Sequence, residues 1–548
     1  MGMHCYLVHI STVDPLNRLY YGDNLDVLRE QIPDESVDLI YLDPPFNSKA
    51  NYNVLFKSPK GEQSEAQITA FEDSWHWTSE SARTLEQLKF KHGELAELLD
   101  LMVRQFGHND LSAYLVMMAV RLVELHRVLK QTGSLYLHCD PTASHYLKMM
   151  LDMIFGVKNF RNEITWKRTT AHNDPKRYGA NTDIILYYTK TDEYCWNCIC
   201  LSHDEEYIAR FKKIDTNGRL WTDDNLTAKG LSGGGYTYEY KGVTSLWRCP
   251  PETMQRLDDE GRLHFTKTGG IRLKRFLDET PGKPAQALWD DISPINSQAK
   301  ERLGYPTQKP LALLERIIQA SSNPGDIVLD PFCGCGTAVH AAQKLGRQWI
   351  GIDITHLAIA LIEKRLRDAF PGIQFTVEGT PKDLDGARDL ASRDKYQFQW
   401  WACSLVNAQP YKGKTKGADS GIDGQIFFTD LEKSKPTIKK IIISVKGGGN
   451  VGAAMIRDLV GTVQRTKAEI GLFVTLTSPT KPMEKEAAAA GFYRAGNGKE
   501  YSRIQILTIE DLLTRRKRPE YWDMDMGELT FKKAQRENTD VAVQGKLF

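Results

Sequence analysis

Short apolar runs alternate with helix-like periodicities over residues 1–380. The run Val37–Leu42 ends at Asp43-Pro44-Pro45, which predicts a buried strand stopped by prolines at its carboxyl end. Residues 112–130 show helical periodicity, and Gly133 ends that helix before the strand SLYLHCD. Further strands are expected at NEITWKR, NTDIILYYTKT, 327–330 and 349–354, and further helices at 82–104, SHYLKMMLDMIFG and 310–321. This alternation predicts an α/β fold with a mainly parallel sheet.

Changes in the pattern divide the chain into parts. Residues 1–380 form the first domain, in which the regular alternation is interrupted by an inserted region at about residues 160–300. Residues 381–394 are polar and are interpreted as a linker. A second, smaller α/β pattern covers residues 395–515, and a charged, loosely ordered tail is expected over 516–548.

Composition bounds the class of protein without deciding its function. The 548 residues are 41% hydrophobic and carry a formal net charge of +1, so any positive potential for nucleic acid must be local. An apolar run long enough for a transmembrane helix is not found, and the N-terminus does not resemble a secretion signal, so a cytoplasmic location is expected. Nine Cys, an odd number, favour free thiols over a disulfide framework.

A glycine loop follows the predicted strand that ends at Asp330. The loop contains Gly334 and Gly336, a helix is expected to begin near Thr337, and a second strand ends at Asp353. In a nucleotide-binding βαβ unit, the glycines admit the ligand and the second acid accepts hydrogen bonds from ribose hydroxyls. The loop lacks GK[ST] and a third glycine at dinucleotide spacing, which favours S-adenosylmethionine over ATP or NAD. The alternative is a plain crossover with a tight turn.

The segment Asp43-Pro44-Pro45-Phe46 supplies what methylation of an exocyclic base amine requires. Such an amine is a poor nucleophile because its lone pair is delocalised into the ring. A carboxylate and a backbone carbonyl that accept both N–H hydrogens would free this lone pair, and proline keeps the carbonyl aimed. Phe46 could stack on a flipped base. The alternative is that these residues only cap a strand and begin a turn.

The motifs LIYLDPPFN, YPTQKPLALLERIIQASSNPGDIVLDPFCGCGT and IGID, in this order, closely resemble the β-class amino-methyltransferases of DNA over residues 18–378. The resemblance implies a Rossmann-like methyltransferase sheet with an inserted target-recognition region, acting on double-stranded DNA. The catalytic pocket would be formed by Asp43, Pro44 and Phe46. The cofactor would be held by Asp330, Phe332, Gly334, Gly336 and Asp353, and its methionine end would be covered by Thr307, Lys309 and Pro310. Aspartate at the start of the catalytic motif is typical of adenine-N6 enzymes, with cytosine-N4 as the alternative.

Target choice is expected within residues 160–300. Four basic residues cluster there and are predicted to contact DNA phosphates: Lys167, Arg168, Lys176 and Arg177. For any one of them, a solvated loop residue is the alternative. The nearby CWNCIC has irregular spacing, which disfavours a zinc site.

The C-terminal region contains a second candidate site. Asp423 begins one strand-like run and Lys446 ends a second, an arrangement that can bind Mg²⁺ through Asp423 and activate water. Residues 395–495 resemble the Mrr-like branch of the PD-(D/E)xK nuclease fold. Ser444 departs from that family, which has an acid or glutamine at this position. Cleavage is the preferred expectation, and an inactive DNA-binding domain is the alternative.

Together these features predict a DNA methyltransferase fused to a nuclease-like domain, as in restriction-modification. A rival from another class is a nuclease or DNA-binding protein whose methyltransferase part is a silent scaffold. The sequence does not decide between a monomer and a homodimer.

Overall fold

The chain divides into two units in the computed structural model. The larger unit combines Met1–Asn197 with Ala287–Val541, and the smaller is formed mainly by Cys198–Gln286. The described residues are 17–45, 51–57, 63–72, 76–170, 176, 178–228, 235–279, 282–296, 298–305, 307–411, 421–432, 435–524, 529–531 and 533–537; for 51–57 and 63–72 only the backbone is described. Within them, every helix is too short or too polar to cross a bilayer.

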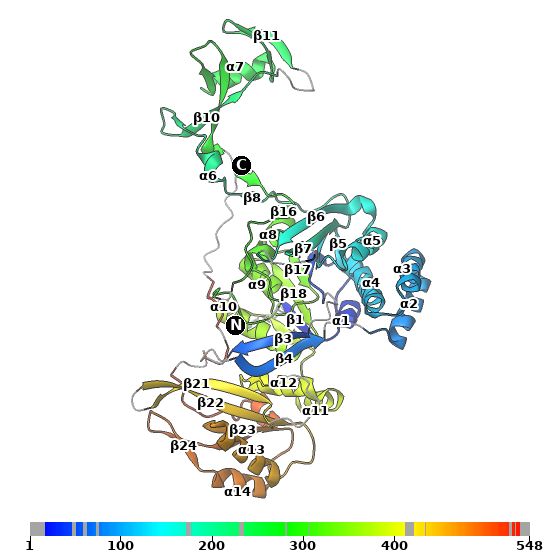
Figure 1. The fold of residues 1–548 in the computed structure, drawn as a ribbon, viewed down its shortest axis with the longest axis vertical. Coiled ribbons are helices and arrows are strands. Elements are labelled where there is room, and N and C mark those ends of the chain that lie inside the picture. Colours follow the sequence, from blue (N-terminus) through cyan, green and yellow to red (C-terminus); the bar gives the residue numbers. More distant parts are fainter. Residues whose placement is uncertain are drawn as a thin grey trace, which may run out of the picture. The chain divides into compact units, whose positions relative to one another are not determined.

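A nine-stranded sheet forms the centre of the first domain (Figure 1), in the order β16-β6-β7-β5-β2-β17-β18-β1-β19. β7 is antiparallel to both of its neighbours, and every other pair in this sheet is parallel. The strands are β1 (Arg18–Tyr21), β2 (Val37–Leu42), β5 (Leu129–Cys139), β6 (Phe160–Lys167), β7 (Thr182–Thr189), β16 (Leu288–Trp289), β17 (Ile327–Asp330), β18 (Gln348–Asp353) and β19 (Thr376–Glu378). The predicted mainly parallel sheet is therefore confirmed.

Helices cover both faces of this sheet (Figure 1) because its strands are apolar on both sides. In β2, Ile40 and Leu42 face one core, whereas Leu39 and Tyr41 face the other. The first core is closed by α1 (Asn24–Gln31), α2 (Ser79–Lys91), α3 (Gly93–Phe106), α4 (Asp110–Val128) and α5 (Ser144–Phe155). The second is closed by α8 (Leu311–Ser321), α9 (Thr337–Lys344) and α10 (His356–Ala369). A separate hairpin is formed by β3 (Asn51–Lys57) and β4 (Gln63–Glu72).

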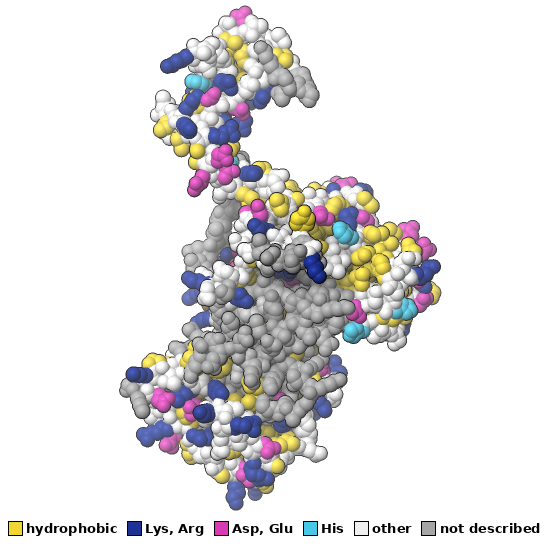
Figure 2. All heavy atoms as spheres, in the orientation of Figure 1, with side chains coloured by type: hydrophobic (Ala, Val, Ile, Leu, Met, Phe, Trp, Pro, Cys, Tyr) yellow, Lys and Arg dark blue, Asp and Glu magenta, His cyan; other side chains and the backbone are white. Residues whose placement is uncertain are grey.

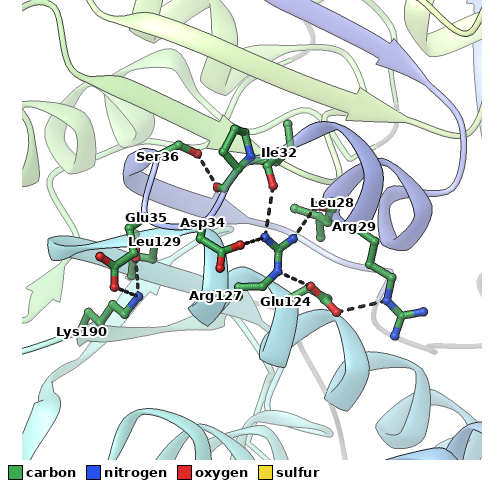
Figure 3. Close-up of polar contacts among 11 residues, drawn as sticks. Leu28, Arg29, Ile32, Asp34, Glu35, Ser36, Glu124, Arg127, Leu129 and Lys190 are labelled. Carbon is green, nitrogen blue, oxygen red and sulfur yellow. Dashed lines mark hydrogen bonds and ion pairs between the residues drawn. The ribbon is translucent and has the colours of Figure 1, made fainter.

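The turn between α1 and β2 is fixed by Arg127 near the end of α4 (Figure 3). Its guanidinium donates to the Leu28 carbonyl at 2.6 Å and to the Ile32 carbonyl at 3.2 Å. It also forms ion pairs with Glu124 and Asp34. These contacts tie the end of α1 and the turn before β2 to the end of α4.

The smaller unit is an insertion between β7 and β16. It holds a four-stranded antiparallel sheet, β13-β14-β10-β9, and the hairpin β11-β12. Its elements are β8 (Cys200–Leu201), α6 (Glu205–Ile208), β9 (Lys213–Ile214), β10 (Leu220–Asn225), β11 (Tyr236–Tyr240), β12 (Val243–Trp247), α7 (Pro251–Asp259), β13 (Leu263–Phe265), β14 (Ile271–Phe276) and β15 (Lys283–Pro284). The expected start of the insertion near residue 160 is wrong, because β6 and β7 complete the central sheet.

The second domain has a five-stranded mixed sheet, β20-β21-β22-β23-β26, so the expected smaller α/β domain is confirmed. Its elements are α11 (Leu384–Arg393), α12 (Lys395–Leu405), β20 (Gln409–Pro410), β21 (Gly424–Glu432), β22 (Lys435–Lys446), α13 (Ala453–Thr466), β23 (Ile470–Thr475), α14 (Lys481–Ala489), β24 (Phe492–Arg494), β25 (Glu500–Ser502), β26 (Ile504–Thr508) and α15 (Ile509–Leu513). The predicted linker 381–394 is instead largely α11. Ala387, Leu390 and Ala391 lie on one stripe of this helix and are buried in the domain core.

Part of the predicted loose tail, 516–548, is also packed. The Thr530 hydroxyl donates to the Phe427 carbonyl at 2.9 Å and accepts from its amide at 3.0 Å. Further along, Glu537 forms ion pairs with His340 at 3.1 Å and Lys344 at 3.3 Å. The described residues of this segment are therefore tied to both domains of the larger unit.

Candidate active site

Asp43 directly follows β2, and Asp330 ends the neighbouring parallel strand β17. The chain order of the strands reverses between β2 and β17, and a crevice opens at such a switch point in open α/β sheets. A cavity of about 280 Å³ lies there. It is lined by most of the predicted site residues: Asp43, Pro44, Pro45, Thr307, Lys309, Asp330, Phe332, Gly334, Thr337 and Asp353.

Gly336 and Pro310 do not line the cavity. Gly336 has a φ of +74°, and an added Cβ would lie 2.8 Å from Ile362 Cγ1, so this glycine lets α9 pack on α10. Phe46 lies outside the described residues.

The Asp43 carboxylate is engaged by a lysine. Lys309 Nζ donates to Asp43 Oδ2 at 2.5 Å, and both side chains are largely shielded from solvent, at 11% and 15% exposed. The sequence placed Lys309 with the cofactor, whereas the structure places it on Asp43. Lys309 lines the same cavity as Asp43, so the predicted catalytic residues and the predicted cofactor-binding residues lie together.

Asp330 and Asp353 end the two strands beside the glycine loop, and their pKa values are displaced. Burial raises the pKa of Asp330 to about 8, although the Phe332 amide opposes the shift. Burial likewise raises the pKa of Asp353 to about 6. Asp353 Oδ2 accepts from the Gly334 amide at 2.9 Å, and Oδ1 accepts from the Thr355 amide and hydroxyl, both at 2.9 Å. These bonds fix the carboxylate beside the loop.

The cavity suits a positively charged adenosyl group better than a phosphate. Four acids line it: Asp23, Asp43, Asp330 and Asp353. The two lining cations, Lys309 and Arg121, are paired with Asp43 and Asp23. S-adenosylmethionine carries a sulfonium and an ammonium group, so the residues present fit it, with Asp353 placed to accept from ribose hydroxyls.

Sequence reasoning missed one wall of the cavity, formed by Asp23, Asn24 and Arg121. Arg121 donates to both carboxylate oxygens of Asp23, at 2.7 and 3.0 Å, and to Asn24 Oδ1 at 2.5 Å. Asn24 Nδ2 in turn donates to the Pro331 carbonyl of the glycine loop at 2.8 Å. The signal was available, since Gly22-Asp23-Asn24 follows β1 at the carboxyl edge of a parallel sheet.

Two of the predicted phosphate-contacting residues lie at the same edge of the sheet. Lys167 ends β6 and is exposed, and Arg168 Nε pairs with Asp183 Oδ1 at 3.2 Å. Lys176 is exposed, and Arg177 lies outside the described residues. In the inserted unit, basic and acidic side chains are interspersed over the visible surface (Figure 2).

In the second domain, the predicted residues come together on adjacent strands. The Asp423 amide donates to the Ile443 carbonyl at 2.8 Å, beside the buried Ser444, and Lys446 ends the same strand. The Asp423 carboxylate accepts from Gln399 Nε2 at 2.9 Å and from the Val445 amide at 2.7 Å.

This donor set does not fit the predicted Mg²⁺ site. Asp423 is the single carboxylate among these residues, and the described part of the chain holds no cluster of three His, Cys, Asp or Glu that could bind a metal. Hard cations require several oxygen ligands, usually carboxylates. Mg²⁺ binding by Asp423 therefore stays a prediction that the donor set does not support.

Comparison with known proteins agrees with this architecture. A family model described as restriction endonuclease matches residues 390–513. Type II methyltransferase M.EcaI of Enterobacter cloacae is 36% identical over 46% of this chain and 57% of its own length. The StyLTI Mod subunit, a type III restriction-modification enzyme of Salmonella typhimurium, is 31% identical over 61% of this chain and 50% of its own. The chain thus spans about half the length of these relatives.

Two further comparisons cover more of their partners. DNA adenine methyltransferase YhdJ of Escherichia coli is 25% identical over 64% of this chain and 82% of its own. The solved structure of a putative DNA modification methylase from Thermus thermophilus is 19% identical, with a TM-score of 0.33 over 66% of this chain and 98% of its own. A family model described as DNA methylase matches residues 37–364, more than half of the sequence, and the chain therefore belongs to the DNA methylase family.

Proposed function

We propose that the protein transfers a methyl group from S-adenosylmethionine to the exocyclic N6 amine of adenine in double-stranded DNA. The observation that carries this proposal is that Asp43 and Asp353, which are 310 residues apart in the sequence, line one cavity at the switch point of the sheet. The cofactor supplies the reactive methyl group on its sulfonium.

The protein supplies two hydrogen-bond acceptors for the target amine. Asp43 and the backbone carbonyl of Pro44 accept the two amine hydrogens, which directs the nitrogen lone pair at the methyl carbon. A C–N bond forms as the C–S bond breaks, the electron pair of the C–S bond stays on sulfur, and the methylated amine then passes a proton to water. A carboxylate has two acceptor oxygens, so Lys309 at Asp43 Oδ2 leaves Oδ1 to accept from the amine.

Adenine is favoured over cytosine by two observations. The catalytic motif opens with Asp43, as is typical of adenine-N6 enzymes in the family it resembles. A relative that covers 64% of the chain is named as a DNA adenine methyltransferase. Mass spectrometry of nucleosides from methylated DNA distinguishes N6-methyladenine from N4-methylcytosine, and the latter product would contradict the assignment.

The inserted unit, Cys198–Gln286, is proposed to read the target sequence, with Lys167, Arg168 and Lys176 contacting phosphates. The second domain supports a role in restriction-modification, and we propose a cytoplasmic location with that role. A silent methyltransferase scaffold is the less supported alternative, because the acids of the cavity are all present.

The central test replaces Asp43 by alanine. Methylation should fall by about a thousandfold or more, because an acceptor for the amine is lost where charge develops. Binding of S-adenosylmethionine, measured by calorimetry, should survive. Asp385→Ala on the exposed surface of α11 serves as the matched control and should leave the rate unchanged. Retained turnover by Asp43→Ala would contradict the proposed amine contact.

A further inference from the structure

A line of polar side chains crosses four neighbouring strands next to the catalytic loop. Tyr41 Oη lies 3.0 Å from His138 Nδ1, and His138 Nε2 lies 3.1 Å from Asp183 Oδ2. Asp183 Oδ1 forms an ion pair with Arg168 Nε at 3.2 Å, without hydrogen-bond geometry. These residues, called here the strand-end chain, come from β2, β5, β7 and the end of β6.

The register of the sheet puts the strand-end chain on the face that carries Asp43. Alternate residues of a strand share a face, so Tyr41 and Asp43 point to the same side of the sheet. Leu42 pairs with Leu137, which makes Asp43 and His138 equivalent positions one residue beyond that pair. Tyr41 also lines the cavity together with Asp43. The strand-end chain therefore ends beside the candidate active site.

Burial makes this arrangement specific. The Tyr41 and Asp183 side chains are 2% exposed and His138 is fully buried, so each polar group depends on its neighbours. Burial raises the pKa of Asp183, but His138, Lys309 and Arg168 together hold it below its ordinary value. Lys309 is the same cation that pairs with Asp43, so the two carboxylates share its field.

Arg168, the outer residue of the strand-end chain, reaches solvent. The Arg168 side chain is 44% exposed, whereas its partner Asp183 is 2% exposed. A guanidinium has five N–H donors, so pairing through Nε does not exhaust it. An arginine that is held by a buried acid and exposed at its tip is preorganised for a phosphate.

We propose that Tyr41, His138, Asp183 and Arg168 act as positioning residues that hold the Asp43 loop in its reactive geometry and tie that geometry to a phosphate contact at Arg168. This inference rests on the proposed function and adds to it. Phosphate binding at Arg168 fixes Asp183, which orients the His138 ring, which in turn fixes the Tyr41 phenol two residues before Asp43. DNA that engages Arg168 therefore raises the rate of methyl transfer, and not only the affinity.

The test compares single-turnover methylation at saturating DNA and S-adenosylmethionine with separately measured affinities for both. Tyr41→Phe removes one hydroxyl and should lower the rate about tenfold, because small misplacements of a reacting group are costly. Affinity for S-adenosylmethionine should stay within about twofold. Arg168→Gln should weaken DNA binding and also lower the rate at saturating DNA. The matched charge control is Lys158→Gln, an exposed residue two positions before β6 begins, which should leave the rate unchanged.

A double variant tests whether the residues of the strand-end chain act together or affect the rate independently. Tyr41→Phe with Arg168→Gln should be no slower than the slower single variant, because either change already breaks the chain. Multiplicative effects would overturn the inference, and so would a normal rate for Tyr41→Phe in protein that binds cofactor and melts like the wild type. Absence of methylation by the wild type would overturn the proposed function and this inference together, whereas an active wild type with normal variants overturns only the inference.

Discussion

Asp330 and Asp353 are two titrating carboxyls that line the candidate cofactor cavity. With a pKa of about 8, raised by burial, Asp330 is largely protonated at neutral pH. Asp353, at about 6, is largely ionised there. A bound sulfonium or ammonium group favours the ionised form of a neighbouring acid, so ligand binding and proton release are coupled.

At the residue scale this coupling gives a signed pH dependence. Affinity for S-adenosylmethionine should increase as the pH rises from 6 to 8, because Asp330 loses its proton in this range and the ionised form attracts the ligand. Calorimetry in buffers of different ionisation enthalpy should detect proton release at pH 7. Asp330→Asn should remove that release and flatten the profile relative to the wild type, which controls for titration of the ligand's own amine. Proton uptake by the wild type would contradict the assignment.

The site residues differ in how far sequence could place them. Asp43, Asp330, Gly334 and Asp353 were predictable, because strand ends and glycine loops leave local signatures. The pairing of Lys309 with Asp43 was not, since it joins residues 266 positions apart and depends on side-chain geometry. Likewise, the contacts of His138 with Tyr41 and Asp183 require the strand order, which no local pattern contains.

At the scale of elements, the anchored start of β2 can be tested through Arg127 (Figure 3). Arg127→Met removes donors from two carbonyls and two carboxylates and should lower the melting temperature by about 5–10 °C. The matched control is Arg29→Met, which loses one partly exposed ion pair with Glu124 and should shift it by about 2 °C or less. Equal shifts for the two variants would show that Arg127 is no special anchor.

Element boundaries were harder to predict than elements. Helix α11 was interpreted as a linker because its exposed face is highly charged, yet Ala387, Leu390 and Ala391 suffice to bury one stripe. The insertion was placed too early, because β6 and β7 lie next to a region of irregular composition. In both cases tertiary packing decided what local polarity could not.

At the scale of the whole molecule, the second domain supplies a prediction about cleavage. The protein should show no Mg²⁺-dependent cleavage of DNA on gels, because Asp423 is the one carboxylate in the described site and Ser444 is a weak ligand. Methylated and unmethylated DNA should both remain intact. Cleavage that is lost in Lys446→Ala would contradict this expectation and identify an active nuclease.

The attachment of the inserted unit has a consequence for the divergence of such proteins. At one junction, the Asn197 amide donates to the Ala320 carbonyl at 2.7 Å, and at the other the Ala287 carbonyl accepts from Thr165 at 2.9 Å. Both anchors belong to the larger unit, and if the inserted unit reads the target as proposed, a lineage that exchanges the residues between them keeps the cavity residues unchanged. New sequence preference would then arise in one recombination event, and host DNA would be marked at new sites before any other gene had changed.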